Sequence, residues 1–127
     1  RRYSKAFFDS NLMYFHLAED ILKDGKSVES EINRCLSYAV TYSVYLYLSL
    51  VSTILEKKQK EEALLELKDI RLQEYITKYG GSSDCSKMVQ LIYWLVQHDL
   101  ASLADKLMIL KNAVRKQQKR EMKWVTI

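Results

Sequence analysis

The chain contains no proline and only three glycines among its 127 residues, so it has few residues that break a helix. Its two cysteines are too few for a disulfide framework, and they fit a reducing compartment. The glycines stand at positions 25, 80 and 81, which leaves no glycine-rich loop for binding a phosphate or a dinucleotide. These absences favour an all-α fold without a nucleotide-binding motif.

The composition, 48% hydrophobic and 28% charged, is that of a globular protein, and the length is that of one domain. We therefore predict a single helical domain over residues 1–127. The chain begins at Arg1 and its first methionine is Met13, which indicates a portion excised from a longer protein. It contains no N-x-S/T site, signal peptide or lipidation motif. We expect an intracellular soluble protein, cytoplasmic or nuclear.

The 21 residues from Cys35 to Leu55 carry no charged side chain. Four tyrosines and six hydroxyl residues in this segment argue against a bilayer span, because tyrosine prefers the membrane interface. Valine and leucine alternate with tyrosine and serine over residues 44–50, a pattern that also fits a buried strand, but no hairpin turn flanks this segment. We predict a central helix that the other helices cover, with the strand and the membrane span as alternatives.

Helices are expected at about residues 4–23, from 27 through the uncharged segment, at 61–79, from about 84, and at about 100–123. Gly25 and Gly80 are typical helix stops, each followed by serine that can cap the next helix. We expect a bend near Lys57–Lys60, with one continuous helix over 27–79 as the alternative. Together these elements predict a single compact bundle of four to five helices.

The first expected helix places apolar side chains on one broad face, with Asn11 in the middle of it. A buried amide there needs a hydrogen-bond partner. The members of this face are Phe7, Phe8, Tyr14, Phe15, Ala18, Ile21 and Leu22.

The last expected helix follows a turn at residues 97–99, with Asp99 as its N-cap; an unbroken helix through the turn is the alternative. Its apolar stripe predicts contact with the body as far as Val114, because the next stripe positions are polar. We expect residues 115–127 to project as a basic helix end. The stripe consists of Leu100, Leu103, Leu107, Leu110 and Val114.

Positive charge is concentrated at the two ends of the chain. Residues 111–123 hold six basic residues and one acidic residue, whereas residues 6–110 carry a net charge of −4. Basic ends of this kind can bind an acidic protein surface or phosphates. The simpler interpretation is a solvated helix end whose cations complement the helix dipole. The predicted contact residues are Lys111, Arg115, Lys116, Lys119, Arg120, Lys123, Trp124, Arg1 and Arg2.

No arrangement of residues predicts catalysis. Cys85 precedes Lys87 in an expected first helical turn, a setting that lowers a thiol pKa, but a structural cysteine is the simpler interpretation. His16 and His98 stand alone, without metal-ligand spacing, and adjacent carboxylates diverge on a helix. We predict no catalytic residue, metal, cofactor or small-molecule substrate, and we expect that the protein is not an enzyme.

Residues 17–50 resemble the first two helices of HEPN domains, which are small helical bundles often tied to RNA cleavage. The resemblance lies in the segments 18–22 (AEDIL), 32–34 (INR) and 38–40 (YAV). The Arg-x4–6-His nuclease motif of that family is absent, since neither histidine follows an arginine at that distance. The resemblance implies a non-cleaving member of the family.

The chain is well patterned for folding and carries no reaction motif. We therefore predict a non-catalytic protein-interaction or scaffold module of a larger protein or assembly, which binds a protein partner or itself. The alternative is a nucleic-acid-binding module, for RNA in particular, that uses the basic face of the last helix.

Overall fold

The structure is a computed structural model that describes residues 5–24 and 29–125, with side chains for residues 5–24 and 30–117. An all-α fold is confirmed, but this part of the chain forms six α-helices and one 3-10 helix, more than the four to five expected. The elements are α1 (Lys5–Asp24), α2 (Glu29–Val51), α3 (Lys57–Leu65), η1 (Glu66–Lys68), α4 (Ile70–Tyr79), α5 (Lys87–Gln97) and α6 (Ala101–Val125).

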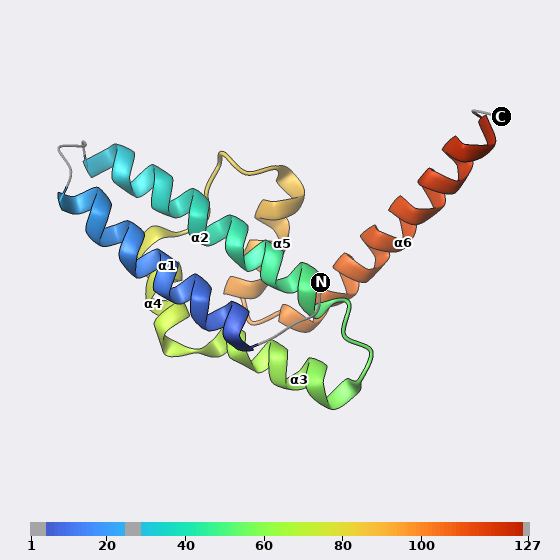
Figure 1. The fold of residues 1–127 in the computed structure, drawn as a ribbon, viewed down its shortest axis with the longest axis horizontal. Coiled ribbons are helices and arrows are strands. Elements are labelled where there is room, and N and C mark those ends of the chain that lie inside the picture. The colour runs from blue at the N-terminus through green and yellow to red at the C-terminus, as the bar shows by residue number, and fades with distance from the viewer. Residues whose placement is uncertain (1–4, 25–28, 126–127) are drawn as a thin grey trace.

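Helices α1 and α2 run side by side, with α3 to α5 gathered along them, and α6 extends away from this body towards the C-terminus (Figure 1). α1 buries a narrow stripe of Phe8, Leu12 and Phe15. Tyr14 and Ile21, predicted on the buried face, are exposed because α1 lies at the edge of the bundle. The Asn11 side chain finds its expected partner, donating a 3.0 Å hydrogen bond to the Phe7 carbonyl.

Helix α2 contains most of the uncharged segment and contacts all five of the other α-helices. The strand alternative for this segment is therefore wrong. Val40, Leu48 and Val51 are completely buried, but Tyr38 and Tyr42 on the outer side are exposed, with their rings stacked. The neighbouring helices thus cover α2 on one side and leave its tyrosine-rich side in contact with water.

A carboxylate side chain caps the start of each of α3 and α4. The chain leaves α2 after Val51, earlier than the bend expected near 57–60, and the Glu56 side chain accepts hydrogen bonds from the Lys58 and Gln59 amides that open α3. Asp69 accepts from the Arg71 amide at the start of α4. The Asp69 cap therefore interrupts the helix expected over 61–79, because it satisfies an amide that a continuous helix would bond internally.

The loop between α4 and α5 is tied to α2. Gly80 ends α4 as predicted, with φ of 61°, and its amide donates to the Ile76 carbonyl. The following N-cap is Ser86, later than expected. Meanwhile the Ser82 amide donates to the Thr41 hydroxyl of α2 at 3.0 Å. The corresponding stop near Gly25 and Ser27 lies outside the described residues.

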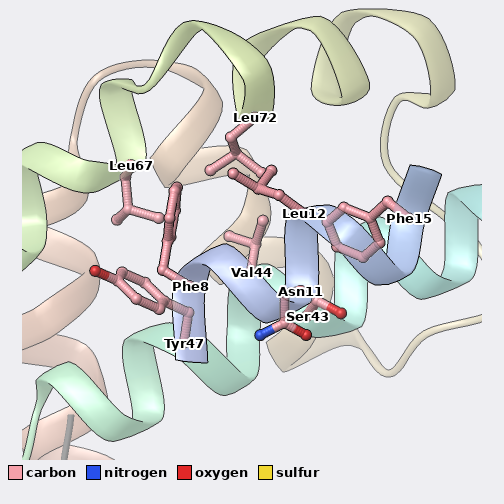
Figure 2. Close-up of a pocket in the computed structure, with 9 residues that line it drawn as sticks. All are labelled: Phe8, Asn11, Leu12, Phe15, Ser43, Val44, Tyr47, Leu67 and Leu72. Carbon is pink, nitrogen blue, oxygen red and sulfur yellow. The ribbon is translucent and has the colours of Figure 1, made fainter. Parts of the chain in front are cut away.

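The hydrophobic core includes a cavity of about 20 Å³ between α1, α2 and the η1–α4 segment (Figure 2). Phe8 and Tyr47 meet edge to face at its wall, and the Tyr47 hydroxyl donates to the Ala63 carbonyl at 2.8 Å. A space of this size holds at most about one water molecule. The cavity is therefore a packing feature of the core and too small for a ligand.

The expected turn at residues 97–99 is present, but Asp99 ends α5 and does not cap α6. Asp99 has φ of 59°, the left-handed conformation. Its amide donates to the Val96 carbonyl, and the Leu100 amide donates to the Leu95 carbonyl at 2.8 Å. This is the Schellman arrangement, which usually has glycine at the left-handed position.

We predict that glycine at position 99 gives a more stable protein than alanine, the reverse of their order inside a helix. The left-handed conformation costs a residue with a Cβ atom about 1 kcal/mol, whereas glycine adopts it freely. Chemical denaturation of Asp99→Gly and Asp99→Ala should differ by about 1 kcal/mol in the free energy of unfolding. Equal stability, or a more stable alanine variant, would contradict the turn described here.

A largely buried ion pair joins α3 to α6. Lys60 Nζ lies 3.0 Å from Asp105 Oδ2, and the two side chains are only 21% and 7% exposed. The second carboxylate oxygen of Asp105 is buried and has no hydrogen-bond partner among the described residues. Asp105 therefore depends on Lys60, because a buried charge without its partner is strongly destabilising.

Replacing Lys60 with methionine should lower the free energy of unfolding by about 2–3 kcal/mol, somewhat less than for a fully buried pair because Lys60 is partly exposed. The double variant Lys60→Met/Asp105→Leu should recover most of that loss, since no charge then stays buried. Urea denaturation of the two variants measures both values. If the double variant is no more stable than Lys60→Met, the loss comes from packing and the ion pair is not its cause.

Candidate interaction surface on helix α6

Helix α6 packs on the body through a face of small and medium side chains. Ala104 and Met108 are completely buried, and Ala101 and Leu107 pack against the edge of the core. Asp105 on the same face makes the ion pair with Lys60. These contacts hold about the first two turns of α6 against the body, and beyond them the helix extends outward (Figure 1).

The apolar stripe of α6 is exposed, contrary to the expectation that it contacts the body. We call the residues Leu100, Leu103, Leu107, Leu110 and Val114 the leucine stripe. Leu107 is half-buried, and the other four side chains are 41–60% exposed. The stripe lies about 120° around the helix from Met108, so the contact through Ala104 and Met108 turns it sideways, away from the core.

Solvated apolar side chains are common singly, but four exposed ones along one helix face are unusual for a monomeric surface. Because each of these side chains is about half exposed, it forgoes part of the about 1.5–3 kcal/mol that complete burial of a leucine provides. The stripe therefore has the character of a binding surface.

The exposed charge on α6 is positive. Between residues 101 and 117 the only acid is Asp105, which is buried and paired. Lys106, Arg115 and Lys116 are exposed. A surface that combines the leucine stripe with Lys106 at its border can bind an apolar and acidic partner, whereas the exposed cations by themselves can bind phosphates.

Lys111 differs from the other predicted contact residues because it is partly buried against α2. Its ammonium group hydrogen-bonds the Tyr45 hydroxyl and lies 4.9 Å from the centre of the Tyr45 ring. Tyr45 in turn stacks on Tyr42, with ring centroids 6.0 Å apart. Lys111 thus helps to fix the direction in which α6 leaves the body, a role that its position in a basic run does not reveal.

The remaining predicted contact residues cannot be placed at the surface. Lys119, Arg120, Lys123 and Trp124 belong to α6, but their side chains lie outside the described part of the chain, as do Arg1 and Arg2 entirely.

Cys85 does not have the reactive setting that the sequence suggested. It precedes the first turn of α5, which begins at Lys87 after the Ser86 cap, and its side chain is buried. Burial raises the pKa of the Cys85 thiol, and the nearby Asp84 carboxylate raises it further. The expectation of a lowered thiol pKa is therefore wrong, and the side chain packs as a small apolar group.

A second concave surface lies between α1 and α4, a cleft of about 710 Å³ with mixed polar and apolar walls. At one end the Glu19 carboxylate accepts hydrogen bonds from Lys78, at 2.8 Å, and from the Tyr79 hydroxyl. At the other end Arg71 is paired with Asp69 and Asp9. The charged groups at the two ends are thus engaged with one another, and they join α1 to α4.

The bonds from Lys78 and Tyr79 hold the pKa of Glu19 below its ordinary value of 4.5. Burial, together with the hydrogen bond to Glu19, raises the pKa of Tyr79 to about 12. The contact between Glu19 and Tyr79 therefore requires an ionised Glu19 carboxylate and a protonated Tyr79 hydroxyl. Both conditions hold at pH values between the pKa of Glu19 and the pKa of Tyr79.

Among the side chains of residues 5–24 and 30–117, no three or more His, Cys, Asp or Glu gather in a way that could hold a metal ion. In the same ranges, no helix combines the length and hydrophobicity that crossing a bilayer demands. Comparison of the chain with protein-family models, with curated proteins and with solved structures finds no match.

The Glu19 contact predicts a dependence of stability on pH. A carboxylate with a lowered pKa in the folded state stabilises the fold above its unfolded pKa, and this stabilisation is lost as the pH falls through the folded value. The wild type should therefore be more stable than Glu19→Gln at pH 7, and the difference should vanish well below pH 4.5. It should also shrink between pH 10 and 12, as Tyr79 loses its proton.

Thermal unfolding across this pH range measures the difference. Glu61→Gln, which removes an exposed carboxylate of α3, is the matched control and should show little pH-dependent difference from the wild type. A Glu19→Gln variant that follows the wild type at every pH would show that the contact contributes nothing to stability.

Proposed function

We propose that this domain is a non-catalytic protein-interaction module, and that it presents the leucine stripe of α6 to a helix of a partner protein. The observation that carries the proposal is the exposure of the stripe on a helix that leaves the body of the fold. A helix that lies along the stripe would bury these side chains without any rearrangement of the core.

Three further features support the proposal. The ion pair between Lys60 and Asp105 and the contact of Lys111 with Tyr45 hold α6 in a defined direction, so the binding surface is formed before the partner arrives. The stripe is also lengthwise continuous, with a leucine or valine in every turn from residue 100 to 114. The core cavity of Figure 2 does not compete with it as a site, since that cavity holds at most about one water molecule.

The proposal includes an intracellular setting, in the cytoplasm or the nucleus. Both cysteines are free, with Cys35 exposed on α2 and Cys85 buried. An exposed unpaired thiol is suited to a reducing compartment.

We predict that Leu103→Gln/Leu110→Gln abolishes partner binding while it changes the free energy of unfolding by less than about 1 kcal/mol, because both side chains are exposed. The matched control is Ile109→Gln, which alters an equally exposed apolar residue on the other side of the same helix. Quantitative co-precipitation from cells, with unfolding curves for each variant, tests this. If every recovered protein binds both variants equally, the stripe is not the binding surface.

Nucleic-acid binding is the second candidate function. Arg115 and Lys116 are exposed and make no ion pair with the side chains that the structure describes. The resemblance of residues 17–50 to HEPN domains is a second reason to examine RNA. Phosphate binding does not use the leucine stripe, so the two candidate functions depend on different side chains of α6.

A nucleic-acid function predicts an affinity for single- or double-stranded RNA or DNA that falls steeply as salt is raised. Arg115→Glu/Lys116→Glu should abolish it, whereas Leu103→Gln/Leu110→Gln should leave it unchanged. Fluorescence anisotropy at two salt concentrations measures both. Absence of binding at low salt eliminates this candidate.

A further inference from the structure

The leucine stripe has the spacing of a coiled-coil seam. Its five members follow one another at intervals of three, four, three and four residues, which places 100, 107 and 114 at one core position of a heptad and 103 and 110 at the other. From Leu100 to Val114 the seam is about 21 Å long at 1.5 Å per residue. It therefore matches two heptads of a partner helix.

Both borders of this seam are basic. In the same heptad, Lys106 and Lys111 occupy the two positions that flank the core, one on each side of the stripe. Lys106 is exposed, whereas Lys111 is partly buried and its ammonium group donates a hydrogen bond to the Tyr45 hydroxyl. The other residues at flanking positions along the described stripe, Ala104 and Ala113, are uncharged.

This distribution disfavours a second copy of the chain as the occupant. In a parallel pair, Lys106 of one copy would face Lys111 of the other, and in an antiparallel pair each lysine would face its own counterpart. Like charges at these positions destabilise the pair and select against it. An acidic helix instead meets a positive charge on both sides.

We infer that the leucine stripe binds an amphipathic helix of another protein, with leucine or isoleucine at its core positions and glutamate or aspartate at its flanking positions. This inference rests on the proposed function and specifies its partner. The apolar seam provides the affinity, and the two lysines select the sign of the partner's charge and its alignment.

Two designed helical peptides of three heptads test the inference. They share leucine and isoleucine at the core positions and differ only at the flanking positions, with glutamate in one and lysine in the other. Fluorescence anisotropy with the whole 127-residue chain should show the acidic peptide binding at least tenfold more tightly than the basic one. The preference should diminish as salt is raised, because the flanking charges are exposed.

Charge reversal on the chain gives a matched pair of variants. Lys106→Glu should weaken binding of the acidic peptide about fivefold and strengthen binding of the basic one. Lys116→Glu makes the same charge change on the side of α6 away from the stripe and should leave the preference intact. Leu103→Gln/Leu110→Gln should abolish binding of both peptides.

Equal binding of the two peptides, lost in Leu103→Gln/Leu110→Gln, would overturn the charge selection and leave the stripe as a binding surface. A dimer of the chain in light scattering that the same substitutions dissociate would identify a second copy as the occupant and overturn the inference. If neither peptide binds, the acidic-helix inference is wrong; the proposed function fails with it only when co-precipitation also shows no partner that depends on the stripe.

Discussion

The seating of α6 on the body through Ala104, Asp105 and Met108 is the constraint on which the interaction surface depends. Alanine allows the helix backbone to approach the core closely, and the ion pair with Lys60 fixes the same face inward. Turning another face of α6 inward would break the pairing of Asp105 with Lys60 and would bring side chains larger than Ala104 against the core, so the leucine stripe stays outside. The exposed surface of α6 is thus a consequence of how its opposite contacts are satisfied.

Contacts at the start of α6 and farther along the helix hold α6 in this orientation. Asp99, in its left-handed conformation, reverses the chain between α5 and α6 and so sets where α6 begins. Farther along, Lys111 contacts Tyr45 of α2 at the point where α6 leaves the body. α2, which touches every other α-helix, connects these contacts to the core around Phe8 and Tyr47. Direction and rigidity of α6 therefore come from the fold and do not require a partner.

Local signals in the sequence predicted part of this structure. Gly80 as a helix stop, the turn before Leu100 and the need of Asn11 for a partner were all visible in the residues themselves, because each depends on neighbours in the chain. The break at Asp69 was missed and the bend expected near 57–60 was placed too late, although Glu56 and Asp69 each lie where an N-cap must lie. In a charged stretch such a cap is hard to tell from surface glutamate or aspartate, so its signal is weak.

Composition and periodicity by themselves determined that the chain is helical, that α2 carries no charge over most of its length, and that α6 has one apolar and one basic side. Only the tertiary structure decided which side of α6 meets the body. Burial stabilises an apolar stripe whether the core of the same chain or another protein covers it. The spacing of the stripe therefore cannot distinguish a core contact from a partner contact. That choice was made by Ala104, Met108 and the pairing of Asp105 with a lysine 45 residues away, a contact between distant segments.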